Sequence, residues 1–406
     1  MPNPSVTVSV AAVLYVAQPP GSLDASFGRS GVTTLADVLP PQATTEQPRE
    51  SPRAVVVDGA GQILIGGYSS STSTQGWVLR LTAEGALDSS FGQGGIVSGF
   101  GVPDSRVLGL VLNEEQLYVG AELTNASATT LGYLRRLSAK GLPETAFNGG
   151  LDVMLPASPS AVTWFDDSAL VTAGGAPYAY LADGTKTPSF VSLTTLAIES
   201  LVLTSSKRLL HGRTVSNHGF EIGRLLSSGG VDSGFGKSGI ASVTCPESKP
   251  FAFDRSITLL PPSSEAAVLA LINCGPGPMV GSELFQSELV AISTDGTPLS
   301  TFGQAGRFTV VPSGQGTAAV TQADGKFVVL GRHVIVTTSS TDVKTKLTRI
   351  EATGTLDSTF GTSGSVELTP IEDNVMAYDA KARRIIVVGS NTTSTGGGLA
   401  IFRVWL

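Results

Sequence analysis

GSLDASFGRSG, residues 21 to 31, is a short motif that this chain of 406 residues repeats along its length. Close copies are GALDSSFGQGG at 85 to 95, GVDSGFGKSG at 230 to 239 and GTLDSTFGTSG at 354 to 364. Weaker copies begin at 141 (GLPETAFNGG), 184 (GTKTPSFVSL) and 296 (GTPLSTFGQAG). Internal similarity of this kind predicts one repeat architecture in place of several unrelated domains.

Three short runs of apolar and β-branched residues separate successive motifs, and a fourth run follows each motif. In the first full unit the runs are PRAVVVD (52 to 58), QILIGGY (62 to 68), GWVLRLT (76 to 82) and GIVSGF (95 to 100). Such runs predict β-strands, here named A to D. Tight A to B connections such as Asp58-Gly59-Ala60-Gly61 predict hairpins. Four antiparallel strands in each of seven units predict an all-β fold, a seven-bladed β-propeller.

The motif itself is the predicted C to D connection of each blade. Its first glycine enters the turn, its aspartate can bond nearby backbone amides, and its phenylalanine fills the space under the loop. A calcium site at the aspartates is disfavoured, because one carboxylate per distant blade is not a clustered ligand set. We expect the motif phenylalanines to be structural, and they are Phe27, Phe91, Phe147, Phe190, Phe235, Phe302 and Phe360.

Opposite charges stand eleven and three residues before the motif phenylalanine in four of the units. The pairs are Arg80 with Asp88, Arg136 with Glu144, Arg224 with Asp232, and Arg349 with Asp357. The units of Phe190 and Phe302 lack both charges. Removing one partner of a buried ion pair leaves an uncompensated charge, whereas replacing both partners can be neutral. We therefore predict that each pair is one structural unit, in which an arginine of strand C holds its own loop.

The motif acid Asp24 has no such arginine before it, since Val16 stands eleven residues before Phe27. The C-terminal stretch IFRVWL (401 to 406) aligns with VLRLTA (78 to 83) and supplies Arg403. We therefore predict a closed ring in which the last blade takes strands A to C from residues 374 to 406 and strand D from residues 31 to 36. Closure also removes the exposed edge that an open array of sheets would leave.

Residues 21 to 406 are thus predicted to form a single propeller domain, with residues 1 to 20 as an N-terminal tether or extra strand. The run VSVAAVLYV (8 to 16) competes for the place of the C-terminal strand, but only the latter carries the arginine. The run is too short to cross a bilayer, and no Lys or Arg precedes it as in a signal peptide. The protein is then cytoplasmic, or its numbering begins after a removed export signal.

Composition narrows the possible partners. Hydrophobic residues make up 41 % of the chain and charged residues 15 %, which is typical of a folded protein. The net charge is −7, and Lys and Arg are scattered singly. A nucleic-acid surface needs clustered cations, so no nucleic-acid partner is expected.

The two cysteines, Cys245 and Cys274, could be buried free thiols or a disulfide. In the predicted topology Cys245 ends strand D of one blade and Cys274 ends strand B of the next. Both then lie at the same end of the molecule, which favours a disulfide and an oxidising compartment.

The motif GxLDxxFGxxG, after strands such as QILIGGY and WVLRL, resembles the delta-60 repeat, a family known chiefly from myxobacteria and related bacteria. Residues 21 to 31, 85 to 95 and 354 to 364 match the motif fully, and residues 230 to 239 lack one position. The three weaker copies depart at the Asp or at the Phe-Gly. The resemblance implies a β-propeller at a bacterial surface or outside the cell, and it implies no catalytic residue.

No common catalytic motif occurs: HExxH, CxxC, the phosphate-binding loop and the dinucleotide motif are all absent from the sequence. The histidines His211, His218 and His333 come from different predicted blades and are interpreted as packed or surface residues. Glu114-Glu115 and Asp166-Asp167 are adjacent acids at predicted hairpin turns and are interpreted as solvated. No catalytic, cofactor-binding or metal-binding residue is predicted.

The loops between strands B and C and between D and A share one predicted face, and they vary far more than the motif face. Variable loops on a rigid scaffold are where binding usually resides. We predict a non-enzymatic scaffold that binds a protein or a glycan through this face. A propeller lyase or hydrolase with a site at the mouth of the central channel, and a purely structural module, remain alternatives. The loops are residues 37 to 51, 69 to 75, 124 to 130, 245 to 253, 275 to 286, 337 to 345 and 392 to 397.

Overall fold

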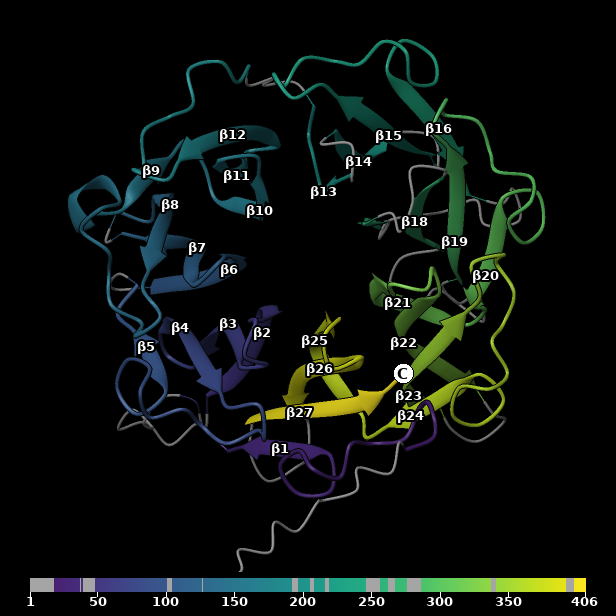
Figure 1. Ribbon diagram of the computed structural model, residues 1–406, viewed down its shortest axis with the longest axis horizontal. Helices are drawn as coiled ribbons and strands as arrows, with labels where there is room; N and C mark the ends of the chain where they lie inside the picture. The colour runs from purple at the N-terminus through teal and green to yellow at the C-terminus, as the bar shows by residue number, and fades with distance from the viewer. Residues whose placement is uncertain are drawn as a thin grey trace, which may run out of the picture.

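The computed structural model arranges the chain as a ring of seven antiparallel sheets around a central axis (Figure 1). It describes residues 18–36, 38, 48–100, 104–125, 127–191, 196–204, 208–215, 219–245, 256–261, 267–275, 286–336, 341–391 and 398–406. Among these residues the only helix is the short 3-10 turn η1 (Asn148–Gly150). The predicted all-β, seven-bladed propeller is confirmed.

Each blade follows the strand order A to D expected from the sequence. Blade 1 contains β2 (Arg49–Val57), β3 (Ile63–Ser70), β4 (Thr74–Leu81) and β5 (Ile96–Ser98). Blade 2 contains β6 (Asp104–Asn113), β7 (Gln116–Thr124), β8 (Thr130–Leu137) and β9 (Val153–Leu155). In blade 3 the described strands are β10 (Pro159–Phe165), β11 (Ser168–Ala173) and β12 (Ala176–Leu181). Residues 192 to 195, which follow the motif of this blade, lie outside the described residues.

The second half of the ring repeats this pattern. Blade 4 contains β13 (Ser200–Leu203), β14 (Leu209–Val215), β15 (Gly219–Leu225) and β16 (Ile240–Thr244). Blade 5 contains β17 (Ser256–Leu260), β18 (Ala267–Cys274), β19 (Gln286–Ser293) and β20 (Arg307–Val311). Blade 6 contains β21 (Gly314–Thr321), β22 (Phe327–Val336), β23 (Thr341–Ile350) and β24 (Ser365–Leu368). Blade 7 contains β25 (Ile371–Asp379), β26 (Arg384–Asn391), β27 (Gly398–Trp405) and β1 (Val32–Leu35).

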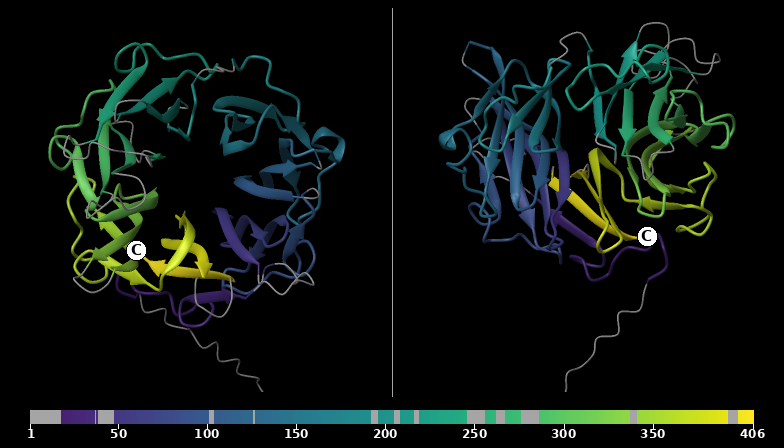
Figure 2. Two further views of the ribbon diagram at one scale, coloured as in Figure 1. Left: turned by 180° about the vertical axis from the view of Figure 1, so that it is seen from behind. Right: turned by 45° about the horizontal axis from the view of Figure 1, so that its top comes forward.

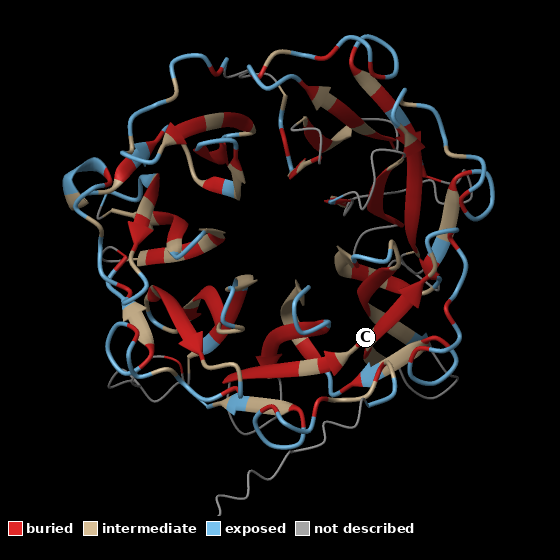
Figure 3. Cartoon of the chain, in the orientation of Figure 1, coloured by how far each residue is buried: buried red, intermediate tan, exposed pale blue. Residues whose placement is uncertain are grey.

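The hydrophobic core lies between adjacent blades, so both faces of a sheet are apolar. In strand β3, Ile63 and Ile65 pack in a cluster with residues of blade 7, whereas Leu64 packs with residues of blade 2. Side chains alternate across a strand, and burial on both faces therefore requires a continuous apolar run. This explains the unbroken ILI of strand B. Figure 3 shows the two middle strands of the blades largely buried and the outer loops exposed.

Blade 7 joins the two ends of the chain, as predicted. Strand β1 pairs antiparallel with β27, with Val32 opposite Phe402 and Leu35 opposite Leu399. Figure 1 shows β1 beside β27, and the left view of Figure 2 shows the same arrangement from behind. The C-terminal residues therefore provide strand C of the last blade, and the competing run at 8 to 16 lies outside the described residues.

The motif also links each blade to the next. The backbone N–H of the residue after each motif phenylalanine donates to a carbonyl in the following blade, at 2.7 to 2.9 Å between N and O. The acceptor lies just before the first glycine of the next motif. The seven bonds run from Gly28 to Glu84, Gly92 to Lys140, Asn148 to Asp183, Val191 to Ser228, Gly236 to Asp295, Gly303 to Thr353, and Gly361 to Pro20. The last bond, from Gly361 to Pro20, joins blade 6 to blade 7 near the N-terminal end of the described chain, and so closes the ring in addition to the pairing of β1 with β27.

The first glycine of the motif is needed for this contact. Gly296 has φ +87°, and a Cβ placed there would lie 2.4 Å from Gly236 Cα in the preceding blade. The position thus excludes a side chain both by backbone conformation and by the approach of the neighbouring turn. Gly59, in the A to B turn of blade 1, differs because a Cβ there would meet nothing within 4 Å.

The predicted disulfide is confirmed. Cys245 follows β16 of blade 4 and Cys274 ends β18 of blade 5, and their Cα atoms are 5.7 Å apart. Both cysteines are buried, so the disulfide joins two neighbouring blades inside their shared hydrophobic core.

Among the described residues, no helix is long and apolar enough to span a membrane.

We expect Gly296→Ala to lower the free energy of unfolding by about 2 to 4 kcal/mol, because it adds backbone strain to a steric clash. Urea unfolding of the purified variant would measure the change. The matched control is Gly59→Ala, for which we expect a change within about 0.5 kcal/mol. Equal effects of the two substitutions would contradict this role of the motif glycine.

Candidate functional site

The structure brings together each charge pair expected from the sequence. The closest N to O distances are 2.9 Å for Arg80 and Asp88, 2.7 Å for Arg136 and Glu144, 2.9 Å for Arg224 and Asp232, 2.7 Å for Arg349 and Asp357, and 3.1 Å for Arg403 and Asp24. Each of these guanidinium groups also lies over the phenylalanine of its own motif, with Cζ 4.7 to 5.4 Å from the ring centroid. The arginine thus covers the buried ring and holds the acid in one position.

A third side chain, from the start of strand B, reaches the same acid and was missed by the sequence analysis. Lys326 Nζ lies 2.7 Å from Asp357 Oδ2, and Arg384 Nε lies 2.7 Å from Asp24 Oδ2. Gln62 donates to Asp88 at 2.8 Å, and Arg208 pairs with Asp232. We name the strand-B residue, the strand-C residue and the motif position together the turn triad.

The two blades without the charge pair change all three positions of the turn triad at once. In blade 3, Ser168 and Thr187 share a hydrogen bond of 2.9 Å between hydroxyl oxygens. In blade 5 the triad is apolar, and it consists of Ala267, Ala291 and Leu299. Blades 3 and 5 therefore replace the charges of the site together, blade 3 with hydroxyl groups and blade 5 with apolar groups. The sequence could have indicated the triad, because its three positions change together. Only the strand-C and motif positions have a fixed distance to the motif phenylalanine, so only these two were recognised.

The motif aspartates use both carboxylate oxygens. In Asp357, Oδ1 accepts from the backbone N–H of Thr359 at 3.0 Å, while Oδ2 faces Arg349 and Lys326. Burial opposes ionisation, but the hydrogen bonds from Lys326 and Thr359 and the charge of Arg349 outweigh it. They hold the pKa of Asp357 well below its usual range. The pKa of Asp24 is lowered in the same way, against burial, chiefly by Arg384 and Ser26.

We predict that Arg80→Ala and Asp88→Ala each lower the free energy of unfolding by about 3 to 5 kcal/mol, and that the double variant loses much less than the sum. The reason is that each single change strands a charge with little access to water. Denaturant unfolding of both single variants and the double variant completes the cycle.

A transplant of the apolar set of blade 5 provides the control. The triple variant Gln62→Ala, Arg80→Ala, Asp88→Leu should recover most of the stability that Arg80→Ala loses. Small, additive effects throughout would show that the turn triad is not a structural unit.

The described histidines are separate from one another. His211, on β14, is 2 % exposed, and its Nδ1 has no hydrogen-bond partner among the described residues. Burial, followed by the nearby charge of Arg213, lowers the pKa of His211 to about 4. His333 lies on β22, and His218 lies outside the described residues. The structure thus gives His211 the environment of a packed, neutral histidine.

Stability should depend on pH through His211. The unfolded chain binds a proton at a pKa of about 6.5 and the folded chain at about 4. Unfolding free energy should therefore fall by about 3 kcal/mol as pH is lowered from 7 to 4. The motif aspartates act in a separate window, because their stabilisation is present above pH about 4 and is lost below it.

Unfolding measured across this pH range in the native chain and in His211→Gln tests the assignment. The variant should lose most of the pH 7 to 4 slope. The remainder belongs to His333, whose pKa is also lowered by burial and by the charge of Lys346. An unchanged slope would assign the dependence to another group.

A cluster of polar and charged side chains forms at the opposite end of blades 6, 7, 1 and 2, where strands A begin and strands B end. We name it the inner cluster, because β2, β6 and β25 are the innermost strands of their blades (Figure 1). Arg49 Nη2 lies 3.0 Å from both Glu372 Oε2 and Asp373 Oδ2, which joins blades 1 and 7. Arg332 of blade 6 lies 3.7 Å from Glu372. The remaining members are Ser51, Arg53, Tyr68, Arg106 and Glu122.

The inner cluster continues from blade 1 to blade 2 around an aromatic ring. Arg53 donates to the Tyr68 hydroxyl at 2.7 Å, and the guanidinium carbons of Arg53 and Arg106 lie 5.3 and 5.4 Å from the Tyr68 ring centroid. Arg106 also pairs with Glu122 at 2.8 Å. Sequence analysis missed the cluster, because its members are brought together only by ring closure and by hairpins of different length.

Local strain accompanies the inner cluster. The pairing of β25 with β26 is interrupted between Glu372 and Val375, and Asp373 has φ +43°, which is unusual for a residue with a side chain. Both polar side-chain atoms of Asn374 are buried without a hydrogen-bond partner among the described residues. Strained backbone and unsatisfied polar groups cost stability and are concentrated at functional sites in proteins.

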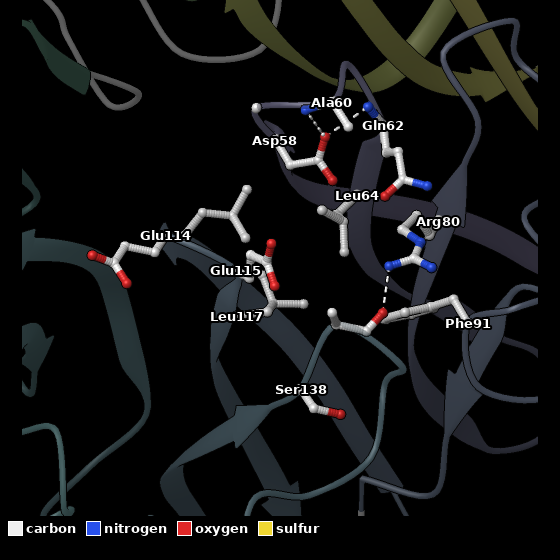
Figure 4. Close-up of a pocket in the computed structure, with 13 residues that line it drawn as sticks. Asp58, Ala60, Gln62, Leu64, Arg80, Phe91, Glu114, Glu115, Leu117 and Ser138 are labelled. Atoms are coloured by element: carbon white, nitrogen blue, oxygen red, sulfur yellow. Dashed lines mark hydrogen bonds between the residues drawn. The ribbon is translucent and has the colours of Figure 1, made fainter.

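A cavity of about 480 Å³ opens at the motif end, between blades 1 and 2 (Figure 4). Leu64, Leu112, Leu117 and Phe91 contribute apolar surface to it. Its polar lining includes Asp58, Gln62, Arg80, Glu114, Glu115 and Ser138. In Figure 4 the Glu115 side chain lies between the Asp58 turn and the Ser138 loop. Glu114 and Glu115 are both exposed turn residues, as expected from the sequence. No group of three or more potential metal ligands occurs in the described part of the chain.

Most of the predicted variable loops cannot be compared with the structure. Residues 69 to 75 are described, as are 124 to 130 except residue 126. The loops at 37 to 51, 245 to 253, 275 to 286, 337 to 345 and 392 to 397 lie wholly or partly outside the described residues. The interpretation of that face as a binding surface therefore depends on the inner cluster.

Comparisons with known proteins agree on the fold. A family described as "Domain of unknown function (DUF5122) beta-propeller" matches residues 61–91, and no curated protein sequence matches. Virginiamycin B lyase from Staphylococcus aureus is a similar solved structure, with 13 % identity, TM-score 0.51, and coverage of 92 % of this chain and 99 % of that one. The α-L-arabinofuranosidase Arb93A from Fusarium graminearum has 11 % identity, TM-score 0.44 and coverage of 92 % and 98 %. The Pan2 WD40 domain from Neurospora crassa has 8 % identity, TM-score 0.39 and coverage of 73 % and 88 %.

Proposed function

We propose that this chain is a non-enzymatic binding propeller of the delta-60 repeat type. It acts at a bacterial cell surface or outside the cell, where it recognises a partner protein through the end of blades 6, 7, 1 and 2 that carries the inner cluster. The observation that supports the proposal is the inner cluster itself, an array of paired and partly exposed charges on strands A and B of four blades. Binding sites built on strands hold their side chains more firmly than sites built on loops.

The pairing within the inner cluster favours recognition over catalysis. Glu372 and Asp373 each have an arginine within 3.0 Å, so their charges are largely neutralised. A general base needs a carboxylate lone pair that can reach a substrate proton. Arg49 is nevertheless 58 % exposed and Glu372 38 % exposed, so both can contact a partner.

The aromatic residue of the cluster favours a protein over a glycan. Sugars stack on a free aromatic face, but the Tyr68 ring is flanked by the guanidinium groups of Arg53 and Arg106. Tyrosine and arginine in close contact are frequent at the centres of protein interfaces. A mixture of both charge signs suits a partner with complementary charges more than a uniformly anionic polymer.

The extracellular placement is supported by the disulfide between Cys245 and Cys274. Disulfides persist in oxidising compartments and are rare in the cytosol. The resemblance of the motif to the delta-60 repeat points in the same direction.

The proposal predicts that the immobilised chain captures a protein from the envelope or secreted fraction of its source bacterium. Arg53→Ala with Arg106→Ala should weaken that capture at least tenfold, because it removes two cationic contacts around Tyr68. Surface plasmon resonance with the purified partner measures the change. The matched control is Arg29→Ala with Lys237→Ala, which removes the same charge from exposed positions at the motif end.

Three results would contradict the proposal. The first is equal loss of capture in the control variant. The second is capture of carbohydrate that strengthens when Arg53 and Arg106 are removed, which would favour a glycan that stacks on the uncovered ring. The third is turnover of a small substrate that the inner-cluster variant abolishes, which would favour an enzyme.

A further inference from the structure

The cavity between blades 1 and 2 has apolar walls and an acidic opening. Among its apolar lining residues Leu112 is partly exposed, whereas Leu64, Leu117 and Phe91 are each no more than 4 % exposed and lie at its base. Asp58 and Glu115 lie above this floor on the A to B turns of two different blades (Figure 4). The volume of about 480 Å³ falls within the range of small ligand sites. An apolar floor under carboxylates fits a group that has an aliphatic stem and a cationic head.

The one cation among the lining residues is already occupied. Arg80 donates to Asp88 at 2.9 Å, to the Ala139 carbonyl at 2.5 Å and to Ser90 at 3.0 Å. These bonds use a donor on each of its three nitrogen atoms, and Asp88 balances its charge. Asp58 and Glu115 therefore leave the cavity with an uncompensated negative charge, which disfavours an anionic ligand.

The neighbouring boundary is bridged by a lysine of the chain itself. Lys381, in the A to B turn of blade 7, donates its Nζ to the carbonyl of Gly59 in blade 1, at 2.9 Å. In the corresponding turn of blade 1 stands Gly59, where a Cβ would meet nothing within 4 Å. The boundary between blades 1 and 2 thus lacks the side chain that spans the previous one.

Strand B shows the same difference. Three blades begin strand B with a cation that reaches the motif acid, namely Arg208, Lys326 and Arg384. Blade 1 has the shorter, neutral Gln62 at this position, and Gln62 lines the cavity. Blade 1 therefore has one cation fewer than these three blades, beside two carboxylates on adjacent turns. Blades 3 and 5 also have a neutral residue at this position, Ser168 and Ala267.

We propose that this cavity binds a lysine or arginine side chain of a partner polypeptide. The aliphatic stem packs on Leu64 and Leu117, and the cationic head lies between Asp58 and Glu115. The site is at the motif end of the molecule, opposite the inner cluster, and is independent of the function proposed above. A free polyamine carries the same chemistry and is distinguished by the test.

The test is a titration followed by NMR of the leucine methyl groups. The probes are a Gly-Lys-Gly peptide blocked at both ends, the same peptide with norleucine in place of lysine, and 1,5-diaminopentane. The lysine peptide should shift the methyl signals of Leu64 and Leu117, and the norleucine peptide should not. Tighter binding of 1,5-diaminopentane than of the lysine peptide would overturn the assignment to a polypeptide.

Two variants locate the site. Glu115→Gln removes the exposed acid at the opening and should weaken lysine binding at least fivefold. Gly59→Lys supplies the missing side chain within the chain, as Lys381 does at the neighbouring boundary, and should abolish binding while leaving thermal unfolding unchanged. The control is Glu84→Gln, an exposed acid at the same end that does not line the cavity.

Binding that survives both Glu115→Gln and Gly59→Lys would overturn the proposal. Equal weakening by Glu84→Gln would also overturn it, because it would show general attraction to an acidic surface. Equal shifts of the methyl signals with the norleucine peptide would also overturn the proposal, because they would show that the cavity binds apolar side chains without selecting a positive charge.

Discussion

The hydrogen bond from the peptide N–H after each motif phenylalanine to a carbonyl of the next blade is the contact on which the ring depends. It joins the turn of one blade to the next blade through backbone atoms alone, and it occurs at every one of the seven boundaries. The glycine beside the acceptor must lack a side chain, and the phenylalanine must be buried for the donor to point outward from its turn. The motif is therefore constant because it makes the contact between blades, while the lengths of the other loops are free to change.

The sequence predicted much of this architecture for a physical reason. Each boundary between blades is made by the same short motif, so the same residues recur along the sequence. Asp24 has no arginine before it, and Arg403 could be assigned as its partner because a closed ring places the C-terminal strand beside residues 31 to 36. The disulfide followed from the topology in the same way.

The remaining features could not be predicted, because they join residues through space at variable separations. Arg384 and Lys326 reach the motif acids from a strand start that has no fixed distance to the motif. The inner cluster unites Arg49 with Glu372, which are brought together only when the ring closes. Glu115 is exposed in its turn, as expected, but the Asp58 turn that faces it across the cavity belongs to another blade and could not be identified from the sequence.

The two ends of the molecule differ in how their charges are used. At the motif end each acid is held by the backbone and by its own arginine, and these interactions stabilise the ring. At the opposite end Arg49, Glu372 and Asp373 pair across blades while remaining exposed, beside a strained residue and an unsatisfied amide. The arrangement at the motif end stabilises the fold. The strained residue and the unsatisfied amide beside the inner cluster lower stability, and recognition of a partner would explain why they are kept. The cavity beside Glu115 is the exception at the motif end.

Amide hydrogen exchange at the seven donors after the motif phenylalanines would settle whether these bonds hold the ring together. The decisive residue is Gly361, whose acceptor is the carbonyl of Pro20, near the other end of the described chain. If the bonds are the common contact between blades, Gly361 and the other six amides should exchange only through global unfolding, all with similar protection. Rapid exchange at Gly361, with protection retained at the amides of β26, would contradict this, because blade 7 would then be folded without being joined to blade 6.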